Sequence, residues 1–107
     1  MAVNNAQEEI RQIAEIIRET VPAERIYLFG SHAYGQPRKG SDYDFFLVMP
    51  DGGMRPMVAM QQAQLALARR MRRTAPIDIL ASTRSEFDEM KKLITLERTI
   101  DRRGIVL

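Results

Sequence analysis

The run of residues 42–49 constrains the fold more than any other segment of the chain. It reads Asp-Tyr-Asp-Phe-Phe-Leu-Val-Met and is apolar at every position after the first three. A strand with apolar side chains on both faces needs other elements to cover both sides of its sheet. The sequence therefore predicts a central strand at 42–49 in a sheet with helices packed against it.

Short strands and a long helix surround this central run. Residues 25–29 and 77–80 predict two further strands, because both stretches are short, largely apolar and bounded by Gly, Pro or polar residues. A helix separates the central strand from 77–80, which favours a parallel pair, whereas the short connection from Phe29 to Asp42 permits an antiparallel pair. The predicted fold class is therefore mixed α/β (α+β), with a mixed sheet of three to four strands flanked by helices.

Apolar periodicity and capping signals predict the helices. Thr83 and Glu86 have the spacing of a capping box, which would open one of them, and Ser31 is expected to cap a short helical turn that ends at Gly35. The helices are expected at about 5–20, 31–35, 56–73, 83–92 and 93–103, with Gly104 and a short terminal strand after them. The helix at 56–73 is expected to carry one apolar stripe, formed by Met57, Met60, Gln64, Leu67 and Met71.

Composition limits the chemistry that this chain can perform alone. The 107 residues include no cysteine and one histidine, His32, which excludes a disulfide framework, a thiol nucleophile and a Cys/His zinc site. Any metal must be held by oxygen, and carboxylates select hard cations such as Mg²⁺. The length suits one domain, 1–107, and the lack of an apolar run of about 18 residues or of a signal segment predicts a cytoplasmic protein.

Three aspartates are the candidates for binding such a cation. Asp42 and Asp44 lie two residues apart on one strand, so they share a face, and their like charges raise each other's pKa unless a cation lies between them. Asp78 stands between Ile77 and Ile79 on the next strand, where burial without a partner would be costly. Asp42 also fits a turn residue, and Asp78 also fits a carboxylate paired with an arginine or a backbone donor.

The segment before these aspartates has features of a phosphate site. Gly30 and Ser31 end one strand and begin a helical turn, where backbone amides favour phosphate oxygens, although a Gly-Ser pair alone also fits a plain turn. Arg38 and Lys39 follow in a loop from which a cation could reach a triphosphate or remain solvated. His32 is expected to be a surface or cap residue.

Together these residues form a more specific pattern than any of them does alone. Gly30-Ser31, a gap of ten residues, Asp42-x-Asp44 and the later Asp78 resemble the signature of the polymerase beta-like nucleotidyltransferase superfamily. The interior Gly35 and a serine, Ser41, directly before the first aspartate also match. In length and layout the chain resembles a minimal nucleotidyltransferase, a catalytic core with no added substrate domain.

The resemblance implies a role for each matching residue. Asp42 and Asp44 would hold two Mg²⁺ ions, and Asp78 would hold the ion that activates the acceptor hydroxyl. ATP would be the substrate. The triphosphate would be bound by Gly30 and Ser31, with Arg38, Lys39 and Ser41 beside them.

These features lead to two hypotheses of different classes. The first is a Mg²⁺-dependent enzyme that transfers AMP from ATP to a hydroxyl of a partner protein, since minimal nucleotidyltransferases are commonly antitoxins paired with a helical HEPN-domain toxin. The alternative is a non-catalytic binding module that neutralises its partner by occlusion. A hetero-oligomer or a homo-oligomer fits either hypothesis, whereas membrane binding and direct nucleic-acid binding are not expected from a net charge of +2.

Overall fold

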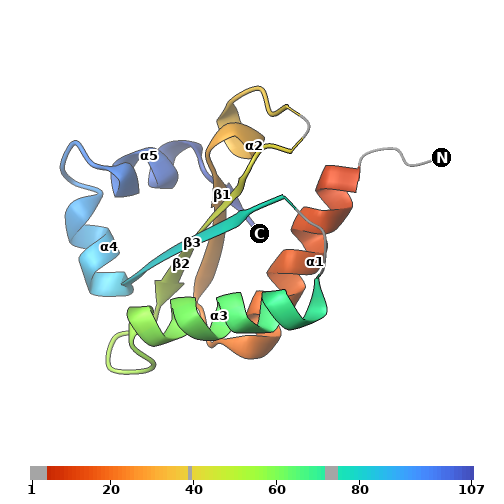
Figure 1. The fold of residues 1–107 in the computed structure, drawn as a ribbon. Helices are drawn as coiled ribbons and strands as arrows, with labels where there is room; N and C mark the ends of the chain where they lie inside the picture. The colour runs from red at the N-terminus through yellow and green to blue at the C-terminus, as the bar shows by residue number, and fades with distance from the viewer. Residues whose placement is uncertain (1–4, 39, 72–74) are drawn as a thin grey trace.

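The computed structural model describes residues 5–38, 40–71 and 75–107, which alternate between helices and strands (Figure 1). In this part of the chain the strands form one four-stranded sheet in the order β3-β2-β1-β4. Strand β2 is parallel to β3 and antiparallel to β1, so the predicted fold class and both pairing directions are confirmed. The elements are α1 (Asn5–Thr20), β1 (Arg25–Phe29), α2 (Ser31–Tyr34), β2 (Tyr43–Met49), α3 (Pro56–Arg70), β3 (Ile77–Thr83), α4 (Arg84–Met90), α5 (Leu96–Arg103) and β4 (Ile105–Val106).

Strand β2 is buried on both faces, as its composition predicts. Phe45 and Leu47 pack into the larger core, which lies between the sheet and helices α1 and α3. Phe46 and Val48 point the other way and join a smaller core with Phe87 of α4 and with α5. We call these two sides of the sheet the α1/α3 face and the α4/α5 face.

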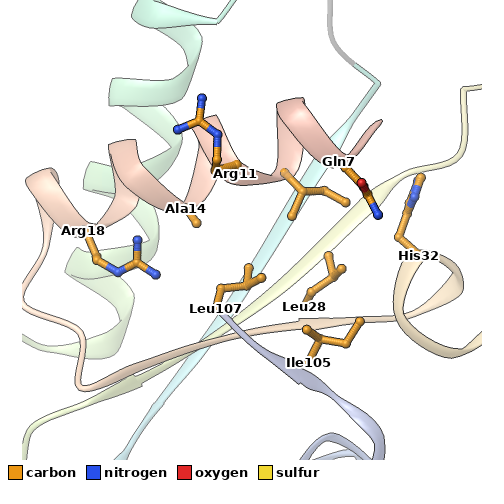
Figure 2. A pocket seen from close by; sticks show the side chains of 9 residues that line it. Gln7, Arg11, Ala14, Arg18, Leu28, His32, Ile105 and Leu107 are labelled. Carbon is orange, nitrogen blue, oxygen red and sulfur yellow. The ribbon is translucent and has the colours of Figure 1, made fainter. Parts of the chain in front are cut away.

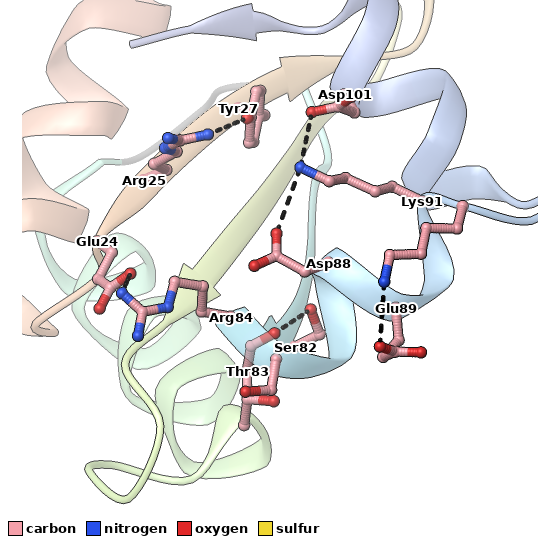
Figure 3. A network of polar contacts seen from close by, with 12 residues as sticks. Glu24, Arg25, Tyr27, Ser82, Thr83, Arg84, Asp88, Glu89, Lys91 and Asp101 are labelled. Carbon is pink, nitrogen blue, oxygen red and sulfur yellow. Dashed lines mark hydrogen bonds and ion pairs between the residues drawn. The ribbon is translucent and has the colours of Figure 1, made fainter.

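Helices α4 and α5 cover only one end of the α4/α5 face. They are short, with seven and eight residues, and the ring of Phe87 lies 5.5 Å from that of Phe46. Lys91 links them, because its ammonium lies 3.3 Å from Asp88 and 3.7 Å from Asp101 (Figure 3). At the other end of the same face, where β2 and β3 begin, the side chains are exposed or half-buried. The sheet therefore offers an accessible surface at the amino ends of β2 and β3.

Several predicted boundaries are wrong by a few residues. Strand β2 begins at Tyr43, one residue after Asp42, and β3 continues to Thr83 because its later residues keep pairing with β2. Ser31 is the first residue of α2 and not its cap; Gly30 occupies the cap position without a side-chain hydrogen bond. Helices α4 and α5 are shorter than expected. Helix α3 ends at Arg70, before the predicted end at 73, because Met71 takes an extended conformation; residues 72–74 lie outside the described residues.

Helix α3 buries only part of the predicted stripe. Leu67 is buried, and Met60 and Met71 are partly buried against the core, whereas the side chain of Met57 is 62% exposed. Ala59 and Ala63, which lie outside the predicted stripe, also face the core. Gln64 is also exposed, and its amide donates to the carbonyl oxygen of Ile77 at 2.7 Å. The two alanines let the helix backbone approach the sheet closely, and the longer Met57 and Gln64 lie outside that contact.

Helix α1 agrees with its predicted bounds. Ile13 and Ile17 are fully buried against the sheet, and α1 also packs against α3. None of the helices in the described ranges combines the length and the apolar character that crossing a bilayer requires.

The predicted capping box at the start of α4 is present and provides a test of local stability. The Thr83 hydroxyl accepts from the backbone N–H of Glu86 at 3.1 Å, and the Glu86 carboxylate accepts from the backbone N–H of Thr83 at 3.2 Å. We expect Thr83→Ala to lower the free energy of unfolding by about 1 kcal/mol, measured by urea denaturation. Thr83→Ser retains a hydroxyl and should lose much less. Equal losses in the two variants would contradict the capping role.

Candidate active site

Two carboxylates lie side by side at the amino ends of β2 and β3. Asp44 on β2 is the direct register partner of Asp78 on β3, and neighbouring strands lie about 4.8 Å apart. The pKa of the Asp44 carboxyl is raised, first by partial burial and then by the negative charges of Asp78 and Asp42. A hydrogen bond with Asp78 acts in the same direction, while His32 opposes it. The sequence-predicted convergence of Asp44 and Asp78 is therefore present.

Asp78 is exposed, so the expectation that it is buried between isoleucines is wrong. Side chains alternate along β3, which places Ile77 and Ile79 on the α1/α3 face and Asp78 on the opposite, open side. Asp42 lies just before β2 and is exposed as well. Its charge still acts on Asp44, so all three aspartates belong to one accessible acidic region.

The bend at Gly30 lies directly against Asp44. Phe29 is the register partner of Asp44 on the other side of β2, and Gly30 follows it with a φ of +77°. A β-carbon at Gly30 would lie 2.1 Å from the Asp44 carboxylate oxygen, so only glycine fits. Ser31, the next residue, is half-buried at the start of α2. The structure thus places the Gly-Ser pair beside the carboxylates, as the sequence predicts.

The loop before β2 is closed by Ser41. Its hydroxyl accepts from the backbone N–H of Arg38 at 2.7 Å, and its own N–H donates to the Arg38 carbonyl at 2.9 Å. The side chain of Arg38 is exposed, and Lys39 lies outside the described residues. Ser41 therefore shapes this loop, and nucleotide binding by Arg38, Lys39 and Ser41 stays a prediction.

Behind the site, His32, Tyr43 and Glu9 form a series of polar and aromatic contacts that the sequence did not predict. His32 is half-buried rather than a surface residue: its ring lies 4.6 Å from that of Tyr43 and donates to the Ser41 carbonyl at 3.3 Å. The Tyr43 hydroxyl donates to Glu9 of α1. Burial, followed by this contact with Glu9, raises the pKa of Tyr43 to about 12. These contacts join α2, the 38–41 loop and α1 at the start of β2.

The chemistry of the acidic region fits a divalent cation. Carboxylate oxygens are hard ligands, and a cation between Asp44 and Asp78 would remove the repulsion that raises the pKa of Asp44. As the side chains stand, no three His, Cys, Asp or Glu groups within the described ranges are gathered closely enough to hold an ion. The complete three-aspartate site therefore stays a prediction.

A separate pocket lies on the other side of the sheet. It has a volume of about 360 Å³ and is lined by residues of α1, β1 and β4, including Arg18, Leu28 and Ile105 (Figure 2). Leu28 belongs to the core of the α1/α3 face, so the sheet separates the main part of this pocket from the carboxylates. It is not the candidate active site.

The close approach of Gly30 to Asp44 gives a test with a matched control. We expect Gly30→Ala to lower the free energy of unfolding by about 1–3 kcal/mol and to displace the Asp44 side chain, because the new β-carbon meets both a strained φ and the carboxylate. Gly52 has a similar φ of +76° with open space around it, so Gly52→Ala should show the cost of the φ alone. Urea denaturation measures both. A smaller loss for Gly30→Ala than for Gly52→Ala would contradict the contact.

The opposed carboxylates predict a gain in stability when one is removed. In metal-free buffer at neutral pH, Asp44→Asn should raise the free energy of unfolding by about 0.5–1 kcal/mol, because like charges directly opposite each other destabilise a sheet. The pKa of Asp44 is raised on folding, so its unfavourable contribution is present above that pKa and disappears as the pH falls below the unfolded-state pKa. The advantage of the variant should therefore vanish in acid.

Thermal unfolding at several pH values, with and without Mg²⁺, measures this effect. Mg²⁺ should stabilise the wild type more than the variant, since binding to the folded state alone adds stability. Asp101→Asn is the control, because Asp101 lies 3.7 Å from the ammonium of Lys91 and its removal should bring no gain. An Asp44→Asn protein no more stable than the wild type in metal-free neutral buffer would refute the repulsion.

Comparisons with known proteins give the family and support the fold. Residues 10–102 match the family model of the nucleotidyltransferase domain. The crystal structure of a Sulfolobus solfataricus protein has the same fold, with a TM-score of 0.55. That protein is described as a nucleotidyltransferase by assignment only. The two sequences are 19% identical over 99% of this chain and 87% of that one. A search of curated proteins gives no significant match. Since the family model spans most of the sequence, the chain belongs to the nucleotidyltransferase domain family.

Proposed function

We propose that the chain transfers AMP from ATP to a hydroxyl of a partner protein in a Mg²⁺-dependent reaction. The observation that carries the proposal is the Asp44–Asp78 pair beside Gly30, in a chain of the nucleotidyltransferase domain family. Nucleotidyl transfer depends on positioning and charge neutralisation more than on acid–base side chains. A cluster of carboxylates next to a phosphate-binding bend supplies those two requirements.

The order of the strands supports a different side of the site for each proposed substrate. Gly30 and Ser31 follow β1, Asp78 lies on β3, and β2 with Asp44 runs between them. The triphosphate of ATP binds on the β1 side, near the backbone N–H groups at the start of α2. The acceptor hydroxyl approaches on the β3 side, next to the exposed carboxylate of Asp78.

Asp42, Asp44 and Asp78 are the residues that would hold Mg²⁺. When bound, the metal neutralises charge on the phosphates and makes the acceptor hydroxyl more acidic. The protein residues fix where these oxygens lie, and partial burial of Asp44 keeps its carboxylate in one place between the two flanking strands.

In the transfer step, the acceptor oxygen attacks the α-phosphorus of ATP. A new bond forms between this oxygen and the α-phosphorus, and the bond from the α-phosphorus to the oxygen that bridges to the β-phosphate breaks. Pyrophosphate leaves toward the β1 side. The hydroxyl proton passes to Asp78 and from there to water.

The proposed partner is a helical HEPN-type toxin, with this chain as its antitoxin. The support for this finer assignment is the resemblance of the sequence to minimal nucleotidyltransferases, which commonly occur in such pairs. ATP as donor and a protein hydroxyl as acceptor rest on the same support.

The test is transfer of label from α-³²P-ATP to the partner in the presence of Mg²⁺. We expect a labelled partner and released pyrophosphate, and about a 100-fold or greater loss of rate in Asp42→Ala, Asp44→Ala and Asp78→Ala. Glu19→Gln, which changes an exposed carboxylate on α1, is the control and should keep the rate. Label transfer that survives all three aspartate changes would refute the mechanism.

The same experiment separates the enzyme from the alternative of an occluding binding module. If the chain silences its partner without ATP and with the three aspartates replaced by alanine, occlusion explains the effect. If silencing requires both ATP and the aspartates, transfer explains it.

A further inference from the structure

A groove lies farther along β3 from the acidic region. It has a volume of about 560 Å³ and lies between the second half of β3, α4 and the start of α5. Strand residues that alternate with a period of two share a face, so Asp78, Leu80 and Ser82 lie in one row. The row runs from the candidate active site to the groove. The residues that line the groove include Ser82, Ser85, Glu86, Glu89, Met90 and Glu97.

Large apolar side chains are exposed around this groove. Leu80, in the row between Asp78 and the groove, is 42% exposed, and Met90 in its lining is 39% exposed. Leu93 and Ile94 in the turn between α4 and α5 are more exposed still, and Leu96 begins α5. Apolar side chains gathered on a surface with a polar rim are typical of a protein-binding site.

The charged groups in the groove lining are all acidic. Glu86 is committed to the capping box of α4, and Glu89 lies 3.3 Å from the exposed ammonium of Lys92 (Figure 3). Glu97, at the first turn of α5, adds a further carboxylate. With Asp78 at the other end of the row, this surface attracts cationic groups and repels the phosphates of nucleic acid.

We propose that the groove binds the acceptor polypeptide of the proposed transfer reaction, through a segment that combines Lys or Arg with apolar side chains. The inference rests on the proposed function and adds where the acceptor docks and what chemistry it carries. Ser82 lies four residues from Asp78 on β3, a span of about 13 Å. An extended acceptor chain covers this distance in roughly four residues, so its basic and apolar segment lies about four residues from the modified hydroxyl.

The binding test uses two fluorescent peptides and no ATP. Each is roughly 16 residues long, with a segment that combines leucines and charged residues and one tyrosine about four residues from that segment; one carries lysines at the charged positions and the other glutamates. We expect the lysine peptide to bind, the glutamate peptide to bind at least about tenfold more weakly, and added salt to weaken the lysine peptide, measured by fluorescence anisotropy.

Variants in the groove locate the binding. Glu97→Lys should weaken the lysine peptide about tenfold by charge reversal, and Met90→Ser should weaken it through lost apolar contact. Glu15→Lys on α1 and Leu65→Ser on α3 are matched controls, because they change an exposed acid and an exposed apolar residue on the other side of the sheet. If Glu97→Lys does not fold, judged by thermal unfolding, Glu89→Lys replaces it.

The outcomes distinguish the groove from the transfer reaction. Calorimetry measures Mg²⁺-dependent ATP binding, and mass spectrometry detects AMP on the tyrosine. If the groove variants weaken the lysine peptide but no AMP is transferred, the groove stands and the proposed function fails. If AMP is transferred but Glu97→Lys and Met90→Ser leave both the peptide KM and the peptide affinity unchanged, the groove inference is overturned.

Other occupants of the groove would also overturn the inference. Equal binding of the two peptides, or binding of an RNA oligonucleotide that Glu97→Lys strengthens, would remove the basic polypeptide as its occupant. A second copy of the chain would show as a dimer in light scattering that Met90→Ser converts to a monomer, and this result would assign the groove to self-association.

Discussion

The direct opposition of Asp44 and Asp78 is the constraint around which the rest of the sheet is arranged. Two like charges at one register position destabilise a sheet, so the pairing of β2 with β3 depends on the apolar residues that follow on both faces of β2. These residues also fix the register: a slip of one position would move Asp44 into the α1/α3 core and Phe45 out of it. Burial of the hydrophobic strand thus holds two carboxylates where they repel each other.

The incomplete cover of the α4/α5 face follows from the same constraint. Helices α4 and α5 bury Phe46 and Val48 and stop short of Asp44, which leaves the carboxylates accessible to water and to cations. Extending the cover would bury charges without a partner, at a cost of several kcal/mol. The same repulsion that lowers stability in metal-free buffer favours binding of a cation, a conflict between stability and function that is common at active sites.

The sequence predicted the parts of the site that depend on local pattern. The helix between β2 and β3 implied the parallel pair that brings Asp78 beside Asp44, whereas Asp42, which was expected on the same strand as Asp44, lies just before β2. The sequence did not predict the features that depend on three-dimensional packing. The stripe buried by α3 depends on how closely its alanines approach the sheet, and the exposure of Asp78 depends on where α4 and α5 end. His32 and Tyr43 lie on two different elements. The periodicity of either element therefore does not predict that their rings are in contact.

The sheet order also gives the two proposed substrates different electrostatic surroundings. The β1 side presents the Gly30 bend, where the backbone itself can approach an anion, while the β3 side continues into a groove lined by glutamates. Under the proposal, the glutamates of that groove would repel a triphosphate, and the divalent cations that accompany ATP would repel a basic polypeptide. Each proposed substrate would thereby be kept out of the other's place, and the two would meet at the carboxylates of β2 and β3. The charge of the groove would then contribute to selectivity for the proposed acceptor.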